Sequence, residues 1–156
     1  MTTRALISSS IAFVVFGLGS TLLGGAAESY GQEEKGQLRA QGKEICQEVQ
    51  SGKMWQVDKK SRFSSAREAE RYAADLQLGG YGDWRLPTKA ELFNLAKVFF
   101  WKKNADCAMN MRGDFWLVDD RGKTSPGHWE IDYACGPRYR YIKATQPKGS
   151  VRAVRP

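Results

Sequence analysis

Residues 79–92 read Gly-Gly-Tyr-Gly-Asp-Trp-Arg-Leu-Pro-Thr-Lys-Ala-Glu-Leu, and this stretch decides the fold. Its two leading glycines follow an apolar-periodic run and can adopt the left-handed backbone conformation that ends a helix. Trp84 and Leu86 then flank Arg85 with the alternation of a short strand. The stretch therefore predicts a junction at which one helix ends and a short buried segment crosses to the start of a second helix.

The second helix is predicted over residues 89–100. Thr88 and Glu91 have the spacing of a capping box, in which each side chain bonds a backbone N–H that the first turn leaves free. Pro87 precedes the cap, where its fixed φ is harmless. Helical spacing predicts one buried apolar stripe, formed by Leu92, Leu95, Ala96 and Phe99. We also expect burial of the aromatic residues beside this stripe, Phe93, Phe100 and Trp101.

The segment before the junction predicts a strand and then the first helix. Residues 53–57 carry bulky, β-compatible side chains, and a basic turn follows them. Ser65 and Glu68 form a second capping-box pattern, which opens a helix that runs through about Leu78. The core face of this helix is predicted to consist of Ala69, Tyr72, Ala73 and Leu76.

After the second helix the sequence changes to a strand pattern. Residues 115–118 form a short apolar run, and residues 119–122 read as a hairpin turn. Alternation of apolar and polar side chains predicts further strands within residues 128–133, 138–142 and 151–155. Four short strands after two helices predict an α+β domain, with two helices packed on a small antiparallel sheet and connected by long loops.

The junction also resembles the signature of the Lcl C-terminal domain family, a bacterial exported module of unknown function with a C-type-lectin-like fold. Three further segments match in the expected order: residues 52–55 as an opening strand, 66–78 as a first helix and 149–155 as a closing strand. The resemblance covers residues 50–156 and implies a binding role without naming a ligand. It assigns the conspicuous motif residues to the fold itself, namely Tyr81, Asp83, Trp84, Arg85, Leu86, Pro87, Thr88 and Glu91.

Residues 1–27 are predicted to be a cleaved signal peptide. Arg4 supplies a positive charge, residues 11–23 supply an apolar core, and residues 25–27 are small, as a cleavage site requires. The alternative is an uncleaved membrane anchor, although the run is short and poorly apolar for a span. Contact with a membrane is expected only if this segment is retained. We therefore expect export to the periplasm or the cell surface.

The rest of the chain is predicted to divide into two parts. Residues 28–50 are polar and rich in glycine, which favours a solvated linker or N-terminal arm. A short helix over residues 39–49 is the alternative for this part. The folded domain, similar to the Lcl C-terminal domain, is then expected over residues 51–156.

Three cysteines in an exported chain predict at least one disulfide, because export leads to an oxidising compartment. We expect the bond Cys107–Cys135, because these residues flank the first strand pair of the predicted sheet. Closing that loop would constrain the unfolded chain by about 3–4 kcal/mol. Cys46 would then be free or available for an intermolecular bond.

The family comparison implies that a second bridge is missing. Many relatives carry one cysteine in the first helix and another in the closing strand. These positions read here as Ala73 or Ala74 and as Ala153. Because both partners are absent, the difference indicates loss of a complete bridge rather than a single unpaired thiol.

Side chains suited to catalysis or metal binding are sparse. The one histidine, His128, lies on the polar side of a predicted strand and cannot build a His-rich zinc site. Turn and loop solvation explains the aspartates, which no segment arranges as a calcium loop: Asp106, Asp114, Asp119, Asp120 and Asp132. We therefore expect no metal, no cofactor and no enzymatic activity.

Residues 85–92 also resemble a motif of sulfatase-modifying, formylglycine-generating proteins, which need two close copper-binding cysteines. An enzyme of this kind is the alternative function.

The strongest remaining signal is positive charge. The chain has 24 Lys and Arg against 17 Asp and Glu, a net charge of +7, and no acidic residue follows Asp132. A basic face with tyrosines would attract an anionic polysaccharide or an acidic partner protein of the envelope. Nucleic acid is not expected as a partner of an exported protein, and a structural subunit of an envelope complex is a further alternative. The predicted ligand contacts are Arg138, Tyr139, Arg140, Tyr141, Lys143 and Arg152.

Overall fold

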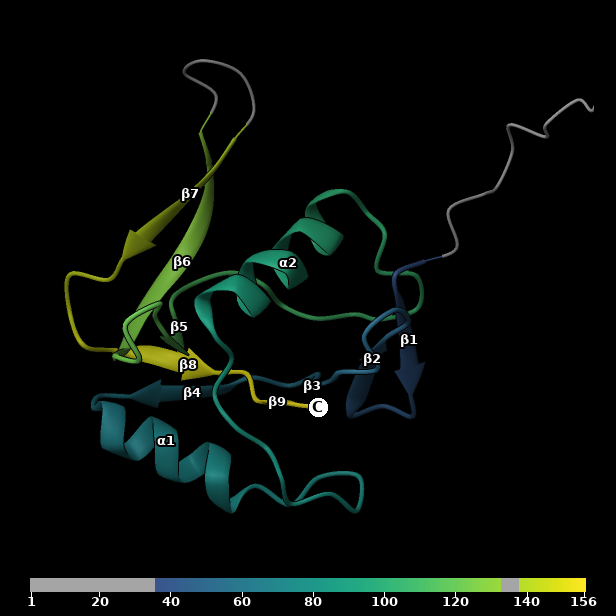
Figure 1. Cartoon of the computed structure of the whole chain (residues 1–156), viewed down its shortest axis with the longest axis horizontal. Helices are drawn as coiled ribbons and strands as arrows, with labels where there is room; N and C mark the ends of the chain where they lie inside the picture. Colours follow the sequence, from purple (N-terminus) through teal and green to yellow (C-terminus); the bar gives the residue numbers. More distant parts are fainter. Residues whose placement is uncertain (1–35, 133–137) are drawn as a thin grey trace, which may run out of the picture. The chain divides into compact units, whose positions relative to one another are not determined.

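The computed structural model describes residues 36–132 and 138–156, which are coloured in Figure 1. The predicted signal peptide, residues 1–27, lies outside the described residues, as does Cys135. The described part forms two helices and nine strands, and the strands make two sheets. The predicted α+β class is therefore confirmed. Neither helix of the described part has the length and apolar character needed to cross a membrane.

The first sheet contains a hairpin where a linker was predicted. Its strands pair antiparallel in the order β1 (Leu38–Gln41), β2 (Ile45–Glu48), β3 (Met54–Gln56) and β9 (Val154–Arg155). The linker prediction for residues 28–50 is wrong for its described part, and so is the helix over residues 39–49. The physical reason is that Leu38, Ile45 and Cys46 are buried in the core, so the segment gains more from pairing than from solvation.

The second sheet has five strands, in the order β4 (Lys60–Phe63), β8 (Gly149–Val151), β5 (Phe115–Val118), β6 (Thr124–Asp132) and β7 (Arg138–Lys143). All its pairs are antiparallel except β5 with β8, which are parallel. The predicted single closing strand over residues 151–155 is divided instead. Its first part is the end of β8, its last part is β9, and Arg152 and Ala153 cross between the two sheets. The closing segment thus joins both sheets.

The second helix agrees with its prediction. α2 (Lys89–Phe100) begins at Thr88, whose side chain accepts from the backbone N–H of Glu91, and the Glu91 side chain completes the capping box. Its fully buried residues are Leu92, Leu95 and Val98. The prediction of a buried stripe is thus correct for Leu92 and Leu95. Ala96 and Phe99 are only half-buried, and Val98, which was not predicted, is buried instead.

The first helix is shorter than predicted. α1 (Ala66–Asp75) begins at the predicted cap Ser65 but ends before Leu76, whose backbone is extended. The reason is that the two glycines do not close this helix. Gly79 and Gly80, at φ +63° and +82°, form a tight turn in which Leu78 and Tyr81 exchange backbone hydrogen bonds at 3.1 Å. Glycine suits this turn because it adopts positive φ without steric cost.

The core consists of two clusters that meet at the junction. The first cluster comprises Leu38, Cys46, Trp55, Leu92, Leu95, Val98, Cys107, Phe115, Leu117 and Val154. The second comprises Ile45, Ala69, Ala73, Trp84, Leu86, Trp116, Val151 and Ala153. Trp84 is 3% exposed, and Arg85 exchanges two backbone hydrogen bonds with Val154 at 2.9 Å. Figure 1 shows the junction passing from α1, beside β4, to α2 on the other side of β8, so the predicted buried crossing is confirmed.

Candidate functional site

The junction uses its charged side chains to hold itself together. Both terminal nitrogens of Arg85 donate to the carboxylate of Glu91, each at 2.8 Å. Glu91 also accepts from the backbone N–H of Thr88 at 2.9 Å and pairs with Lys53 Nζ at 3.2 Å. Burial acts to raise the pKa of Glu91, but the hydrogen bonds outweigh burial and lower that pKa to about 2. These residues therefore stabilise the fold.

The other polar groups of the junction are also engaged within the fold. Arg155 donates through Nε and Nη2 to the carboxylate of Asp83, at 2.6 and 3.0 Å. The guanidinium carbon of Arg155 lies 3.9 Å from the centroid of the Tyr81 ring, and Trp84 Nε1 donates to the Tyr81 carbonyl at 3.1 Å. These polar groups of the junction therefore contribute to the fold and leave few free donors or acceptors for a ligand.

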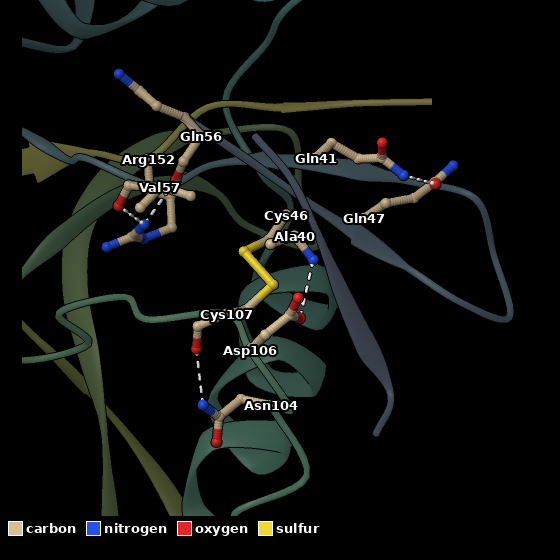
Figure 2. The surroundings of a disulfide bond; sticks show 10 residues. All are labelled: Ala40, Gln41, Cys46, Gln47, Gln56, Val57, Asn104, Asp106, Cys107 and Arg152. Atoms are coloured by element: carbon tan, nitrogen blue, oxygen red, sulfur yellow. Dashed lines mark hydrogen bonds between the residues drawn. A yellow bond between two sulfur atoms is a disulfide. The ribbon is translucent and has the colours of Figure 1, made fainter. Parts of the chain in front are cut away.

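Arg152, one of the predicted ligand contacts, is buried and supports the fold. It is 0% exposed, and its guanidinium donates to the carbonyl oxygens of Gln56 and Val57 (Figure 2) and to that of Asn110 at 2.9 Å. Burial lowers the pKa of Arg152 to about 10, which the charge of Asp58 partly opposes. The surface prediction is wrong because it assumed one regular strand, whereas the chain leaves one sheet for the other at this residue.

The remaining predicted contacts lie on β7 but not on one face. Arg140 is exposed, and its Nη2 is 3.5 Å from the Glu130 carboxylate on β6. Tyr141 is half-buried against Trp129, with ring centroids 5.3 Å apart, and Lys143 is exposed. Because successive strand residues point to opposite faces, Arg140 does not share a face with Tyr141 and Lys143. The side chains of two further predicted contacts, Arg138 and Tyr139, lie outside the described residues.

A row of lysine and aromatic side chains follows α2 instead, and we call it the lysine–aromatic row. Its members recur at every fourth position of the helix and continue onto β6 and β7: Lys89, Phe93, Lys97, Trp101, Trp129 and Tyr141. The ring centroids of Phe93 and Trp129 are 4.4 Å apart. Lys89 Nζ lies 5.3 Å from the Tyr141 centroid, and Lys97 Nζ lies 5.3 Å from the Phe93 centroid. A lysine cation thus lies over an aromatic ring at two places in the row.

Sequence reasoning missed this row, although its spacing was visible. Lys89, Phe93, Lys97 and Trp101 are each four residues apart, which makes successive members neighbours on the surface of a helix. The expectation that Trp101 is buried is wrong, because this residue is 55% exposed. The helix ends at Trp101, and the chain then turns away at Lys102, whose φ is +55°.

A hollow of about 610 Å³ lies at the Trp101 end of the row. Its lining comes from the residue before β1, from β2 and its connection to β3, and from α2 with the segment after it: Gln37, Glu48, Gln50, Ser51, Lys53, Asn94, Lys97, Val98, Trp101 and Lys103. The Glu48 carboxylate is already engaged, because it accepts from Trp55 Nε1 at 2.7 Å and from Ser51 Oγ. The hollow therefore combines an indole face with ammonium, amide and hydroxyl groups.

A smaller hollow of about 250 Å³ lies at the Lys89 end and is lined in part by Tyr141 and Lys143. The aspartates there have local roles. Asp119 accepts from the backbone N–H groups of Arg121 and Lys123 at 2.9 and 2.8 Å, which is the turn role that the sequence predicts. Asp120 pairs with Lys89 at 3.5 Å.

Figure 2 shows a disulfide between Cys46 of β2 and Cys107, which links the segment after α2 to the first sheet. The predicted Cys107–Cys135 pairing is therefore wrong, because the segment after α2 folds back onto β2. Asp106 Oδ1 accepts from the backbone N–H of Ala40 at 3.0 Å in the same region. The N–H of Gln37 donates to the carbonyl of Lys103 at 2.7 Å. Two lining residues of the hollow are thus joined directly, close to the covalent bond.

His128 bridges two carboxylates on the second sheet. Its Nδ1 lies 2.5 Å from Asp114 Oδ1, and its Nε2 lies 2.9 Å from Glu130 Oε1. Partial burial disfavours the charged ring, but the hydrogen bonds that the ring makes to the Glu130 and Asp114 carboxylates outweigh burial and raise the pKa of His128 above its ordinary value. Among the described residues, no group of three or more histidine, cysteine and acidic side chains is arranged to hold a metal ion.

Comparison with known proteins gives one match. The family model described as the Lcl C-terminal domain matches residues 44–155, which confirms the resemblance of the junction. The match begins within the first hairpin, at the residue before β2, and ends at the last residue of β9. It therefore includes the whole lysine–aromatic row. No curated protein and no solved structure matches the chain.

Proposed function

The chain belongs to the Lcl C-terminal domain family, and from this premise we propose that it is an exported, non-catalytic module that binds an anionic polysaccharide. The binding surface is the lysine–aromatic row together with the hollow at Trp101. The observation that carries this proposal is the 55% exposure of Trp101 at the end of a row in which lysines alternate with rings. The indole of Trp101 thereby offers flat apolar surface beside the ammonium, amide and hydroxyl groups of the hollow.

The chemistry of the row suits an acidic sugar polymer. Ring faces offer flat apolar surface on which the C–H face of a sugar can pack, and the neighbouring ammonium groups attract its carboxylate or sulfate groups. Members of the row that are four residues apart are separated by about 6 Å along the helix, so several sugar units can be contacted at once. The hydroxyl and amide groups of the hollow can bond the sugar hydroxyls.

The lysines of the row keep most of their charge available. Lys97 has no ion-pair partner among the described residues, and it lies over the Phe93 ring. Lys89 pairs only loosely with Asp120, whose side chain is 78% exposed. Exposed pairs of this kind contribute little and are readily exchanged for a ligand anion. The overall charge of +7 adds a long-range attraction for polyanions.

The bonding state of the cysteines supports the proposal that the protein is not an enzyme. The enzymatic alternative, a sulfatase-modifying protein, needs two close reduced cysteines that bind copper. Cys107 is instead bonded to Cys46. Titration of free thiols and of copper binding in the purified protein separates the two functions. Two reactive thiols together with tight copper binding would favour the enzyme.

The family membership also supports export and a C-type-lectin-like form of the fold. β9, at the end of the matched range, pairs with β3, which lies near its start, so the two ends of the range are held together. A disulfide suits an oxidising compartment. Fractionation of cells that produce the full chain, with detection in periplasm, medium and membranes, tests the location and the fate of residues 1–27.

The binding proposal is tested with dextran sulfate and neutral dextran, which share a backbone. We expect the protein to bind dextran sulfate with an affinity that falls steeply with salt, and to bind neutral dextran far more weakly. Lys97→Ala and Trp101→Ala should each weaken binding by about fivefold or more. The control Arg67→Ala removes one exposed charge on α1, away from the row, and should change the affinity by less than about twofold.

Two outcomes would contradict the proposal. Equal affinity for the two dextrans would show that the row is not a site for an anionic polysaccharide. An affinity for dextran sulfate that stays unchanged in Lys97→Ala and Trp101→Ala would show the same. A partner protein that co-purifies in fixed ratio, together with no binding to dextran sulfate, would indicate a structural subunit of an envelope complex instead.

A further inference from the structure

The edge strand β4 contains a bulge that places Arg62 in a strained conformation. Lys60 pairs with Val151 and Phe63 pairs with Gly149, so three steps along β4 face two steps along β8. The extra residue leaves Arg62 with a φ of +74°. A residue with a Cβ atom rarely adopts this conformation, because the Cβ approaches the following carbonyl oxygen. Bulges and strained residues of this kind recur where a side chain must be directed at a ligand.

The bulge directs Arg62 to the boundary of two neighbouring hollows. One, of about 570 Å³, lies over the start of β8 and is lined by Arg62, Ser64, Asp114, Lys148, Gly149 and Ser150. The other, of about 750 Å³, lies beside α1, and its lining includes Arg62, Ser64, Arg71 and Tyr72. Because Arg62 and Ser64 line both hollows, a ligand can occupy one and extend into the other.

The hollow over β8 has a fixed floor. The backbone N–H of Ser150 donates to the carbonyl of Asp114 at 2.9 Å, and Trp116 Nε1 donates to the carbonyl of Phe63 at 3.2 Å. At Gly149 an added Cβ would lie 3.1 Å from Pro126 Cβ and 3.2 Å from the Asp114 carbonyl, so the backbone packs closely there. The side chains of Arg62 and Lys148 therefore stand over a rigid surface.

The charges of this hollow favour a compact anion. Arg62 and Lys148 contribute two cations, and both are exposed. Asp114 is the one acidic residue of its lining, and its carboxylate is engaged by His128 at 2.5 Å. The Ser150 hydroxyl adds a neutral donor, whereas the Ser64 hydroxyl already donates to Glu68 Oε2 at 3.4 Å. A guanidinium presents two parallel N–H donors, which match two oxygens of a phosphate group, and a lysine adds a point charge.

From this arrangement we propose that the hollow between the β4 bulge and the start of β8 binds a phosphate monoester. The phosphate lies between Arg62 and Lys148, and Ser150 lines the floor beneath it. The organic part extends into the neighbouring hollow toward Arg71 and Tyr72. This site is separate from the lysine–aromatic row: none of its residues belongs to the row, and it is built on β4, β8 and α1 rather than α2.

The test uses the purified, isotope-labelled protein and NMR titration with glucose 6-phosphate, with glucose as the neutral control. We expect saturable shifts of the Gly149 and Ser150 amides with glucose 6-phosphate and none with glucose. Arg62→Gly should weaken this binding by about tenfold or more, because the two guanidinium donors of Arg62 are lost. The same variant should not lower the melting temperature, because glycine adopts a φ of +74° without strain.

Matched variants separate a site from general charge. Lys148→Ala should also weaken binding, whereas Arg67→Ala, which removes a charge from α1 outside both hollows, should leave it unchanged. Trp101→Ala should leave it unchanged as well, so that failure of this site and failure of the polysaccharide surface are distinguishable. Shifts that persist in both Arg62→Gly and Lys148→Ala, or that glucose produces equally, would overturn the proposal.

Two further probes identify the source of the phosphate. Vesicles of phosphatidylcholine with phosphatidic acid expose a monoester, whereas vesicles with phosphatidylglycerol expose only a diester. Arg62-dependent binding to the first vesicles indicates a lipid headgroup, and binding to glucose 6-phosphate alone indicates a soluble ester. Both results support a phosphate monoester site. Equal binding to both kinds of vesicle, unaffected by Arg62→Gly, counts against it.

Discussion

Both terminal nitrogens of Arg85 donate hydrogen bonds to the Glu91 carboxylate, and this pair joins the buried crossing to the first turn of α2. The arginine comes from the segment that bonds β9, and the glutamate completes the cap of the helix. One carboxylate thus serves two elements at once. Its loss should affect the stability of the whole fold rather than the end of one helix.

Glu91 should make the stability of the fold sensitive to acid. Its pKa is about 2 in the folded protein against 4.5 ordinarily, so the folded state favours the charged form. Ionised Glu91 therefore contributes about 2–3 kcal/mol to the free energy of unfolding. This contribution is complete above about pH 4.5 and is lost as the pH falls toward 2. Urea unfolding at a series of pH values should show this loss in the natural protein. The Glu91→Gln variant should be less stable at pH 7, and its free energy of unfolding should change less between about pH 4.5 and 2. If the pH dependence of the variant equals that of the natural protein, Glu91 is not the group responsible.

Arg152 should matter for stability and not for ligand binding. Arg152→Ala leaves three backbone carbonyls without their donor and opens a cavity, so we expect a loss of about 3–5 kcal/mol in the free energy of unfolding. Arg140→Ala removes an exposed arginine whose partner is also exposed, and it should cost less than about 0.5 kcal/mol. Chemical unfolding of both variants makes the comparison. Similar midpoints for the two would contradict the buried role.

The Cys46–Cys107 bond should contribute to stability through the unfolded state. It closes a loop of 61 residues in sequence, and its removal should cost about 2–4 kcal/mol. Peptide mapping without reduction should recover Cys46 linked to Cys107. The paired variant Cys46→Ser with Cys107→Ser should lower the melting temperature, whereas Cys135→Ser should not. A peptide that links Cys107 to Cys135 would overturn this pairing.

A second bridge should be possible where the family resemblance implied one. Ala73 and Ala153 are both buried in the second core cluster, whereas Ala74 is exposed, so Ala73 is the better placed of the two candidate positions for a bond to residue 153. Ala73→Cys combined with Ala153→Cys should form a bond under oxidising conditions and add about 2–4 kcal/mol. The control pair of Ala74→Cys and Ala153→Cys should remain as free thiols, which mass spectrometry can count.

Local chemistry predicted the parts of the fold that depend on neighbouring residues. Thr88 and Glu91 determine the start of α2, because both members of the capping box lie within one turn. Trp84 is buried as its alternation with Leu86 indicates. The glycine pair was ambiguous, because positive φ serves a helix end and a two-residue turn equally well.

Two of the errors concern partners that are distant in the sequence. The role of Arg152 depends on where the chain leaves one sheet for another, and a break of alternation at one residue turns its side chain inward. The partner of Cys107 depends on the path of the segment after α2, which the spacing of cysteines does not encode. The lysine–aromatic row was visible as a four-residue spacing, but the exposure of Trp101 was not.

The division of residues 149–155 between two sheets also restricts when the domain can form. β8 lies between β4 and β5, and β9 lies beside β3, so neither sheet is complete until this segment has left the ribosome. A nascent chain that still lacks residues 149–155 therefore cannot complete either sheet. For the proposed export, this late completion would keep the polypeptide able to pass through a narrow translocation channel before it folds.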